Sequence, residues 1–173
     1  MTRTEQEQLF SGLYQENRPR ILRLCRGYLG SEQEAEDLFQ EIMVNVWNSL
    51  PAFRNEARIT TWIYRIAVNT ALLYRKRWRR RETISAPLDP DRIEHAAVAQ
   101  DRHDDERRLR DLHNAIATLA SQDRLIITLL LDGLSYRDIS DITGISTNYV
   151  GVKISRIKQT LEKRVTEVAN GAI

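Results

Sequence analysis

The sequence predicts an all-α protein made of two small helical domains that a flexible linker joins. Aromatic residues, glycine and proline are scarce, whereas residues with high helix propensity such as Leu, Ala, Arg and Glu are frequent. Apolar residues also recur with a helical period over most of the chain. This period is lost around Pro87 and Pro90. We therefore expect one domain at 4–81, a linker at 82–103 and a second domain at 104–166.

The composition narrows the class of function. Charged residues make up 29% of the chain, but the formal net charge is only +2, so nucleic-acid binding must be argued from where the charges lie. Cys25 is the only cysteine and the three histidines are scattered, so we expect no disulfide, metal ion or cofactor. No apolar run reaches the roughly 18 residues of a membrane span. The N-terminal residues also lack a signal-peptide core, which favours a cytoplasmic protein.

Serine residues mark the expected helix starts. Ser31 precedes Glu34 by three positions, and Ser135 precedes Asp138 by three. This spacing is typical of a capping box, in which the serine and the acidic side chain each bind the other's backbone N–H. Ser146 is a further N-cap candidate. These residues predict helices that begin just after each serine.

The first strongly amphipathic segment, 31–48, has an apolar face and an acidic face. The apolar face contains Leu38, Phe39, Ile42, Met43, Val46 and Trp47. The opposite face contains Asp37, Gln40, Glu41, Val44 and Asn48. The polar face is either simply solvated or a docking surface for a basic partner helix, and the apolar Val44 among the carboxylates favours docking. Nothing nearby supplies a nucleophile or a metal, so we expect no catalytic carboxylate pair.

The next segment, 58–81, reads as a basic helix. Its expected core stripe is Ile59, Trp62, Ile63, Ile66, Ala67, Thr70 and Leu73. Its C-terminal end, "RKRWRRR", carries six cations in seven residues. A helix dipole acts only within the last turn, so the dipole alone does not account for this run. Phosphate binding explains it better than a solvated charge run does. The preceding loop, 51–58, is by itself only a connector.

The segment 135–161 predicts a helix-turn-helix with Gly144 in the turn. The expected core contacts join Ile139 and Ile142 to Val150, Ile154, Ile157 and Leu161. The outer face of the second helix shows Asn148, Val152, Ser155, Arg156 and Gln159, flanked by Gly151, Lys153 and Lys158. Short polar groups edged by cations suit a DNA major groove. The alternative is a plain helical hairpin with a solvated outer face.

These segments, in this order, resemble the extracytoplasmic-function group of bacterial RNA polymerase sigma factors, which is group 4 of the sigma-70 family. "EAEDLFQEIMVNVW" is similar to the family's region 2 helix that binds polymerase. "FRNEARITTWIYRIAVNTALLYRKRWRR" is similar to its promoter-melting segment, which reads the −10 element. "LDGLSYRDISDITGISTNYVGVKISRIKQTL" is similar to region 4, which reads the −35 element. The resemblance extends over about residues 8–165.

The resemblance implies a sigma factor that binds core RNA polymerase and directs promoter-specific initiation. The implied polymerase-binding residues are Asp37, Gln40 and Glu41, with Val44 on the same face. The implied −10 residues are Phe53, Arg54, Asn55, Glu56 and Ala57, which capture a flipped base, and Arg65, Asn69, Arg75, Lys76 and Arg77, which hold the DNA backbone. The implied −35 residues are Tyr136, Asn148, Tyr149, Gly151, Val152, Lys153, Ser155, Arg156 and Lys158. The family often has a basic residue at 151 and a small one at 149, which leaves the −35 sequence preference open.

The implied partners are core RNA polymerase, through its β′ coiled coil and its β flap, and promoter DNA. An anti-sigma factor, which in the family is often membrane-anchored, is also implied. No small-molecule substrate is expected. A polymerase-independent helix-turn-helix regulator is the main alternative, but it leaves the acidic helix unexplained. A purely protein-binding helical adaptor is a third class. An enzyme is not expected, because no nucleophile–base set or glycine-rich phosphate loop is present.

Overall fold

The computed structural model describes residues 2–29, 31–54, 57–85 and 104–170. Within these ranges it contains seven α helices, one short 3-10 helix and no strand. The expected all-α fold in two helical groups is therefore confirmed. The expected linker falls largely on residues 86–103, outside the described ranges. The third helix continues to Ser85, past the linker start predicted at 82, because the restriction that Pro87 places on its neighbour acts only at residue 86.

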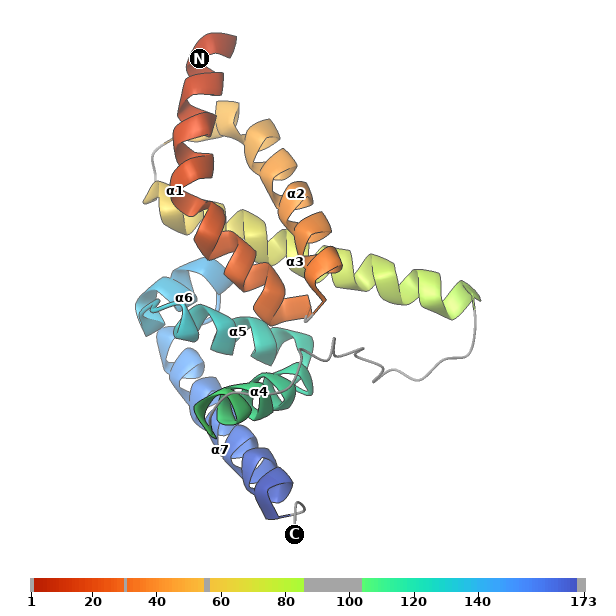
Figure 1. Ribbon diagram of the computed structural model, residues 1–173. Helices are drawn as coiled ribbons and strands as arrows, with labels where there is room; N and C mark the ends of the chain where they lie inside the picture. The colour runs from red at the N-terminus through yellow and green to blue at the C-terminus, as the bar shows by residue number, and fades with distance from the viewer. Residues whose placement is uncertain (1, 30, 55–56, 86–103, 171–173) are drawn as a thin grey trace.

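Helices α1, α2 and α3 form the N-terminal group (Figure 1). Their bounds are α1 Arg3–Leu29, α2 Glu32–Ser49 and α3 Ile59–Ser85, with the 3-10 helix η1 at Leu50–Ala52. Helix α2 packs against both α1 and α3. The C-terminal group contains α4 Asp104–Ala117, α5 Ser121–Leu131, α6 Tyr136–Thr143 and α7 Thr147–Asn170. The two ends of the chain lie at opposite ends of the molecule in Figure 1.

The predicted caps and the predicted turn are present. The side chain of Ser31 accepts a hydrogen bond from the backbone N–H of Glu34. Ser135 and Asp138 form a complete capping box at the start of α6. Helix α6 ends at Gly144, whose φ of 76° is the left-handed conformation that favours glycine. Local sequence chemistry therefore sets the ends of the helix-turn-helix.

The apolar faces of α2 and α7 lie where the periodicity predicts them. The buried residues of these faces are Leu38, Phe39, Ile42, Met43, Val46, Val150, Ile154, Ile157 and Leu161. The stripe predicted for α3 is wrong at one end, because Leu73 is 59% exposed. Tyr64, Val68 and Ala71 are buried in addition to the expected Ile63, Ala67 and Thr70. Helix α3 is covered by the N-terminal group and also by α5 and α6, so its buried face turns away from Leu73.

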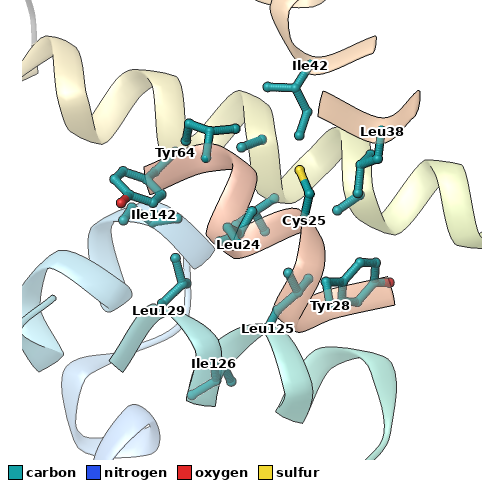
Figure 2. Packing of buried hydrophobic residues seen from close by; sticks show 14 of the residues in the cluster. Leu24, Cys25, Tyr28, Leu38, Ile42, Tyr64, Leu125, Ile126, Leu129 and Ile142 are labelled. Atoms are coloured by element: carbon teal, nitrogen blue, oxygen red, sulfur yellow. The ribbon is translucent and has the colours of Figure 1, made fainter. Parts of the chain in front are cut away.

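One hydrophobic core runs through both groups of helices. Figure 2 shows Leu24, Cys25 and Tyr28 of α1 close to Leu125 and Leu129 of α5. Leu24, Cys25, Tyr28 and Leu129 have no exposed surface, and Leu125 is buried too. The two groups therefore pack together as one body, an arrangement on which the sequence analysis made no prediction.

A matched pair of truncations tests the core of the C-terminal group. Ile154→Ala should lower the free energy of unfolding by about 2–5 kcal/mol, because a fully buried side chain leaves a cavity. Val152→Ala, two residues away on the exposed face of α7, should change it by less than about 0.5 kcal/mol. Urea unfolding followed by circular dichroism measures both values. Equal losses would contradict the orientation of α7.

The thiol of Cys25 should be chemically silent in the folded protein. Burial raises its pKa to about 12, so at pH 8 only about one thiol in ten thousand is the reactive thiolate. We expect iodoacetamide to leave the native protein unlabelled over hours and to label it fully in urea, with free cysteine as the positive control. Mass spectrometry reads the modification. Fast labelling of native protein would show that this part of the core opens.

Candidate functional site

The acidic face of α2 is open to solvent. Asp37 and Gln40 are exposed, and Val44 is 56% exposed. Glu41 is different, because its carboxylate forms an ion pair with Arg77 of α3 and its side chain is only 32% exposed. The four residues predicted to bind polymerase thus share one side of the helix, and three of them are free to meet a partner.

Tyr74 of α3 borders this acidic face and was not predicted to be part of it. Partial burial raises the pKa of its phenol, and the carboxylates of Asp37, Glu34 and Glu41 raise it further. Tyr74 therefore remains a neutral hydroxyl beside a carboxylate cluster. The sequence carries no local signal for this placement, because Tyr74 and Asp37 lie on different helices.

The loop that follows η1 is anchored on α3 by an aromatic contact. The ring centroids of Phe53 and Trp62 are 4.8 Å apart, at an interplanar angle of 44°. Phe53 and Ala57 are half-buried and Arg54 is exposed. The predicted residues Asn55 and Glu56 lie outside the described residues. The described part of the loop therefore has a fixed base and an exposed cation.

The cations predicted along α3 are not all free. Asn69 and Lys76 are exposed, and Arg75 is half-buried. Arg65 donates from its Nε to the backbone carbonyl of Asp141 in α6, at 2.6 Å. Arg77 pairs with Glu41, as described above. The side chains of residues 78–81, the rest of the basic run, lie outside the described residues.

The outer face of α7 presents most of the side chains predicted for DNA. The exposed residues on this face are Asn148, Tyr149, Val152, Ser155, Arg156 and Lys158. Lys153 is instead engaged within the protein. Its ammonium is 2.5 Å from a carboxylate oxygen of Asp123 in α5 and 5.8 Å from the ring centroid of Tyr149. Asp123 is a partner that the sequence analysis missed, because 30 residues separate it from Lys153.

Gly151 leaves room for a neighbouring aromatic ring. A Cβ atom at this position would lie 3.6 and 3.8 Å from two ring carbons of Tyr136, the first residue of α6. These are ordinary van der Waals distances, so a methyl group fits beside the ring. The glycine inside α7 therefore sits beneath Tyr136, which is itself a predicted DNA contact and is 40% exposed.

The described residues contain no group of three or more His, Cys, Asp or Glu side chains that could hold a metal ion. The described surfaces carry groups suited to binding other macromolecules. They include an acidic helix face with an exposed valine, a helix with exposed cations, and a helix-turn-helix with a polar and basic outer face.

Comparisons with known proteins match both groups of helices. The family model for Sigma-70 region 2 matches residues 13–82, and that for Sigma-70, region 4 matches residues 109–161. The chain is 32% identical to the RNA polymerase sigma-H factor of Pseudomonas aeruginosa, over 83% of this chain and 79% of that protein. It is 30% identical to the ECF RNA polymerase sigma-E factor of Escherichia coli K12, over 76% of this chain and 74% of that one.

Two solved structures share the fold. The sigma factor RpoE in complex with the anti-sigma factor NepR, from Bartonella quintana, matches with a TM-score of 0.70 at 21% identity, over 91% of this chain and 96% of that chain. CnrH in complex with the cytosolic domain of CnrY matches with a TM-score of 0.67 at 18% identity, over 93% of this chain and 90% of that chain. At these identities the structural matches bear on the fold alone.

The position of Gly151 beneath Tyr136 predicts the effect of a methyl group there. Gly151→Ala should raise the free energy of unfolding by about 1 kcal/mol, because alanine is the better helix former and the new contact is not strained. Gly12→Ala in α1, where nothing lies within 4 Å of the added Cβ, is the matched control and should give a similar gain. Thermal unfolding compares the variants. A loss of stability confined to Gly151→Ala would show that Tyr136 packs closer than the structure indicates.

Proposed function

The chain belongs to the extracytoplasmic-function group of bacterial RNA polymerase sigma factors, and from this premise we propose which surfaces carry out each step. As a member of this family it binds core RNA polymerase and directs promoter-specific initiation. The observation that carries the assignment is the presence of region 2 and region 4 on one chain. No observation favours the polymerase-independent regulator. The protein acts by binding, in the cytoplasm beside the polymerase.

The open side of α2 is the surface for the β′ coiled coil. Asp37 and Gln40 offer acceptors to a basic partner helix, and Val44 supplies apolar area at the centre of the contact. Glu41 joins this contact when a basic side chain of the partner takes the place of Arg77 in the ion pair with Glu41. An exposed valine surrounded by polar side chains is typical of a protein–protein interface, because water leaves the apolar centre when the partner binds.

The loop at 53–57 and the exposed side of α3 take the −10 element. The contact of Phe53 with Trp62 holds the base of the loop, so that the rest of it can enclose a base that has left the stack. Asn69, Lys76 and the arginines of α3 bind the phosphates around that base. Reading and melting are then one event, because the base is read only after it has flipped.

The outer face of α7 enters the major groove at the −35 element. Val152 is placed to meet a thymine methyl group, and Arg156 to reach a guanine edge. Tyr136, Tyr149 and Lys158 flank these residues and bind phosphates. Ser155 and Asn148 complete the polar face, Gly151 leaves room for the ring of Tyr136, and Lys153 reaches DNA only when it leaves Asp123. The same C-terminal group contacts the β flap of the polymerase.

We include an anti-sigma factor among the partners of this chain. Both structural neighbours were solved with a bound protein, the anti-sigma factor NepR in one and the cytosolic domain of CnrY in the other. The anti-sigma factor of this chain has one domain in the cytosol and an anchor in the membrane, and the cytosolic domain bound to CnrH supports this part of the proposal. The chain itself has no helix, in the parts that the structure describes, with the length and apolarity to cross a bilayer.

A charge reversal on α2 tests the assignment of the docking surface. Asp37→Lys should weaken binding to core polymerase at least about tenfold, since it places a cation against a basic partner. It should also abolish the promoter-dependent transcript in a run-off assay with core polymerase and genomic promoter fragments. Glu16→Lys makes the same change of charge at an exposed site on α1 and should have no effect on either readout.

Two outcomes would overturn these assignments. If wild-type protein yields no promoter-dependent transcript with any genomic promoter, the function itself is wrong. If Asp37→Lys and Glu16→Lys behave alike while wild-type protein is active, the docking surface lies elsewhere. Fluorescence titration of labelled protein with core polymerase separates loss of docking from loss of promoter recognition.

A further inference from the structure

One cation that belongs to the DNA face of α7 is already paired inside the C-terminal group. We propose that Asp123 of α5 competes with DNA phosphates for the ammonium of Lys153, and that this competition limits the affinity of α7 for DNA of any sequence. Asp123 thereby controls how tightly this helix binds, and not where it binds. The proposal rests on the function assigned above, because it concerns the surface assigned to the −35 element.

The ion pair between Lys153 and Asp123 is partly shielded from water. Its side chains are 20% and 30% exposed, and the ammonium nitrogen lies 2.5 Å from a carboxylate oxygen. In the surface pair of Arg3 with Glu7, by contrast, the side chains are 88% and 54% exposed. Water and salt screen a shielded pair less than an exposed one, so its charges attract each other more strongly. A phosphate that takes Lys153 therefore has to displace a partner that holds it.

Asp123 is held in place by the packing of its helix. It lies in the first turn of α5, and α5 packs against α7. The N-terminus of a helix carries a partial positive charge, which stabilises a carboxylate in the first turn. Asp123 therefore remains a charged group at a fixed position beside α7 even when Lys153 moves away from it.

Lys153 lies at the border of the outer face of α7. Tyr149 precedes it by four positions and Arg156 follows it by three, so the three side chains form one line along the helix. Tyr149 and Arg156 are exposed. The Lys153 ammonium is 5.8 Å from the centroid of the Tyr149 ring, which is within the range of a cation–π contact. Lys153 thus stands between two residues assigned to DNA, although its ammonium contacts α5.

A phosphate that approaches this line meets both charges of the pair. If Lys153 stays with Asp123, the carboxylate repels the phosphate and offsets much of the attraction of the ammonium. If Lys153 leaves, the protein exchanges one ion pair for another. In both cases the gain in binding free energy is smaller than the gain from an unpaired lysine. Asp123 therefore lowers the affinity of α7 for DNA.

Competition for a phosphate carries no information about sequence. Phosphate contacts position a protein on the duplex, whereas contacts with base edges select the sequence. The residues assigned to base edges are Val152 and Arg156 of α7, and neither takes part in the ion pair with Asp123. We therefore expect the pair to lower the affinity for a promoter and for an unrelated duplex by the same factor.

A purely positioning role for Asp123 predicts the opposite effect. An ion pair can hold a lysine in the place that DNA requires, and losing the carboxylate then weakens binding because the side chain must be ordered again. The exposure of the side chain favours competition. Lys153 is only 20% exposed while it is paired, so its charge is largely withdrawn from the solvent through which DNA approaches.

Removing the carboxylate of Asp123 tests the proposal in the full chain. Asp123→Asn keeps the shape of the side chain and removes its charge. We expect binding to a fluorescent duplex at low salt to strengthen about threefold, because one more phosphate is neutralised by an unpaired cation. The logarithm of the binding constant should also fall more steeply with the logarithm of the salt concentration, by about 0.9. Fluorescence anisotropy measures both quantities.

Two duplexes of equal length separate affinity from preference. One is taken from a promoter that the wild-type protein transcribes with core polymerase, and the other contains the same bases in scrambled order. Asp123→Asn should strengthen binding to both by the same factor. A gain confined to the promoter duplex would show that Asp123 acts on base recognition, which contradicts the proposal.

Three further variants serve as controls. Asp111→Asn in α4 makes the same change in net charge and should leave binding unchanged. Lys153→Gln should remove the effect of Asp123→Asn, so that the double variant binds DNA as Lys153→Gln alone does. Asp123→Glu keeps the carboxylate and should retain the wild-type salt dependence. Circular dichroism checks that each variant is folded, and Asp123→Ser is a second neutral variant if Asp123→Asn is not.

The remaining outcomes each overturn one proposal. Unchanged affinity and salt dependence in Asp123→Asn would show that Asp123 does not compete, and weaker binding would show that it positions Lys153 instead. A gain that persists beside Lys153→Gln, or that Asp111→Asn reproduces, would show a general effect of net charge. Each of these results ends the competition proposal while wild-type transcription still supports the function. A wild-type protein that is inactive in the run-off assay overturns the function, and with it the −35 assignment.

Discussion

The buried carboxylate of Asp132 determines how the two groups of helices sit together. A charge taken out of water needs partners, and in this chain they are Arg23 of α1 and the hydroxyl of Tyr64 of α3. Because these come from two different helices, satisfying Asp132 fixes both the distance and the orientation of the C-terminal group. The leucine core then fills the space that this placement defines. Gly27 of α1 lets α1 approach Thr128 of α5 closely, because a Cβ atom there would lie 2.9 Å from a methyl carbon of Thr128. Among the described residues that were predicted to bind DNA or polymerase, Arg65 is the one that donates a hydrogen bond across this contact.

The contact between the two groups of helices affects the three predicted surfaces unequally. The acidic face of α2 points away from the interface and stays open, whereas Arg65 on α3 is engaged by α6. The outer face of α7 is exposed as well.

Features set by neighbours in sequence could be predicted, and features set by distant partners could not. The capping box at Ser135, the left-handed Gly144 and the apolar stripe of α7 depend on residues a few positions apart, and the structure confirms them. Leu73 was misplaced because periodicity reports a single buried face, whereas α3 is covered from two sides. The Arg23–Asp132 pair spans 109 residues, and nothing near either residue marks it. Of the candidate sites, the choice of helix faces was predictable, but the internal partners of their charges were not.

The internal partners of these cations, like the low net charge of the chain, bear on how strongly the free protein binds DNA. Arg65, Arg77 and Lys153 are all assigned to DNA, yet each is engaged within the protein, by the carbonyl of Asp141, by Glu41 and by Asp123. Binding a phosphate then exchanges one partner for another, so the free energy gained is smaller than for a free cation. Non-specific DNA affinity grows with the number of cations that release counterions. Because these side chains are engaged and the net charge is only +2, we expect the free protein to bind DNA at large only weakly.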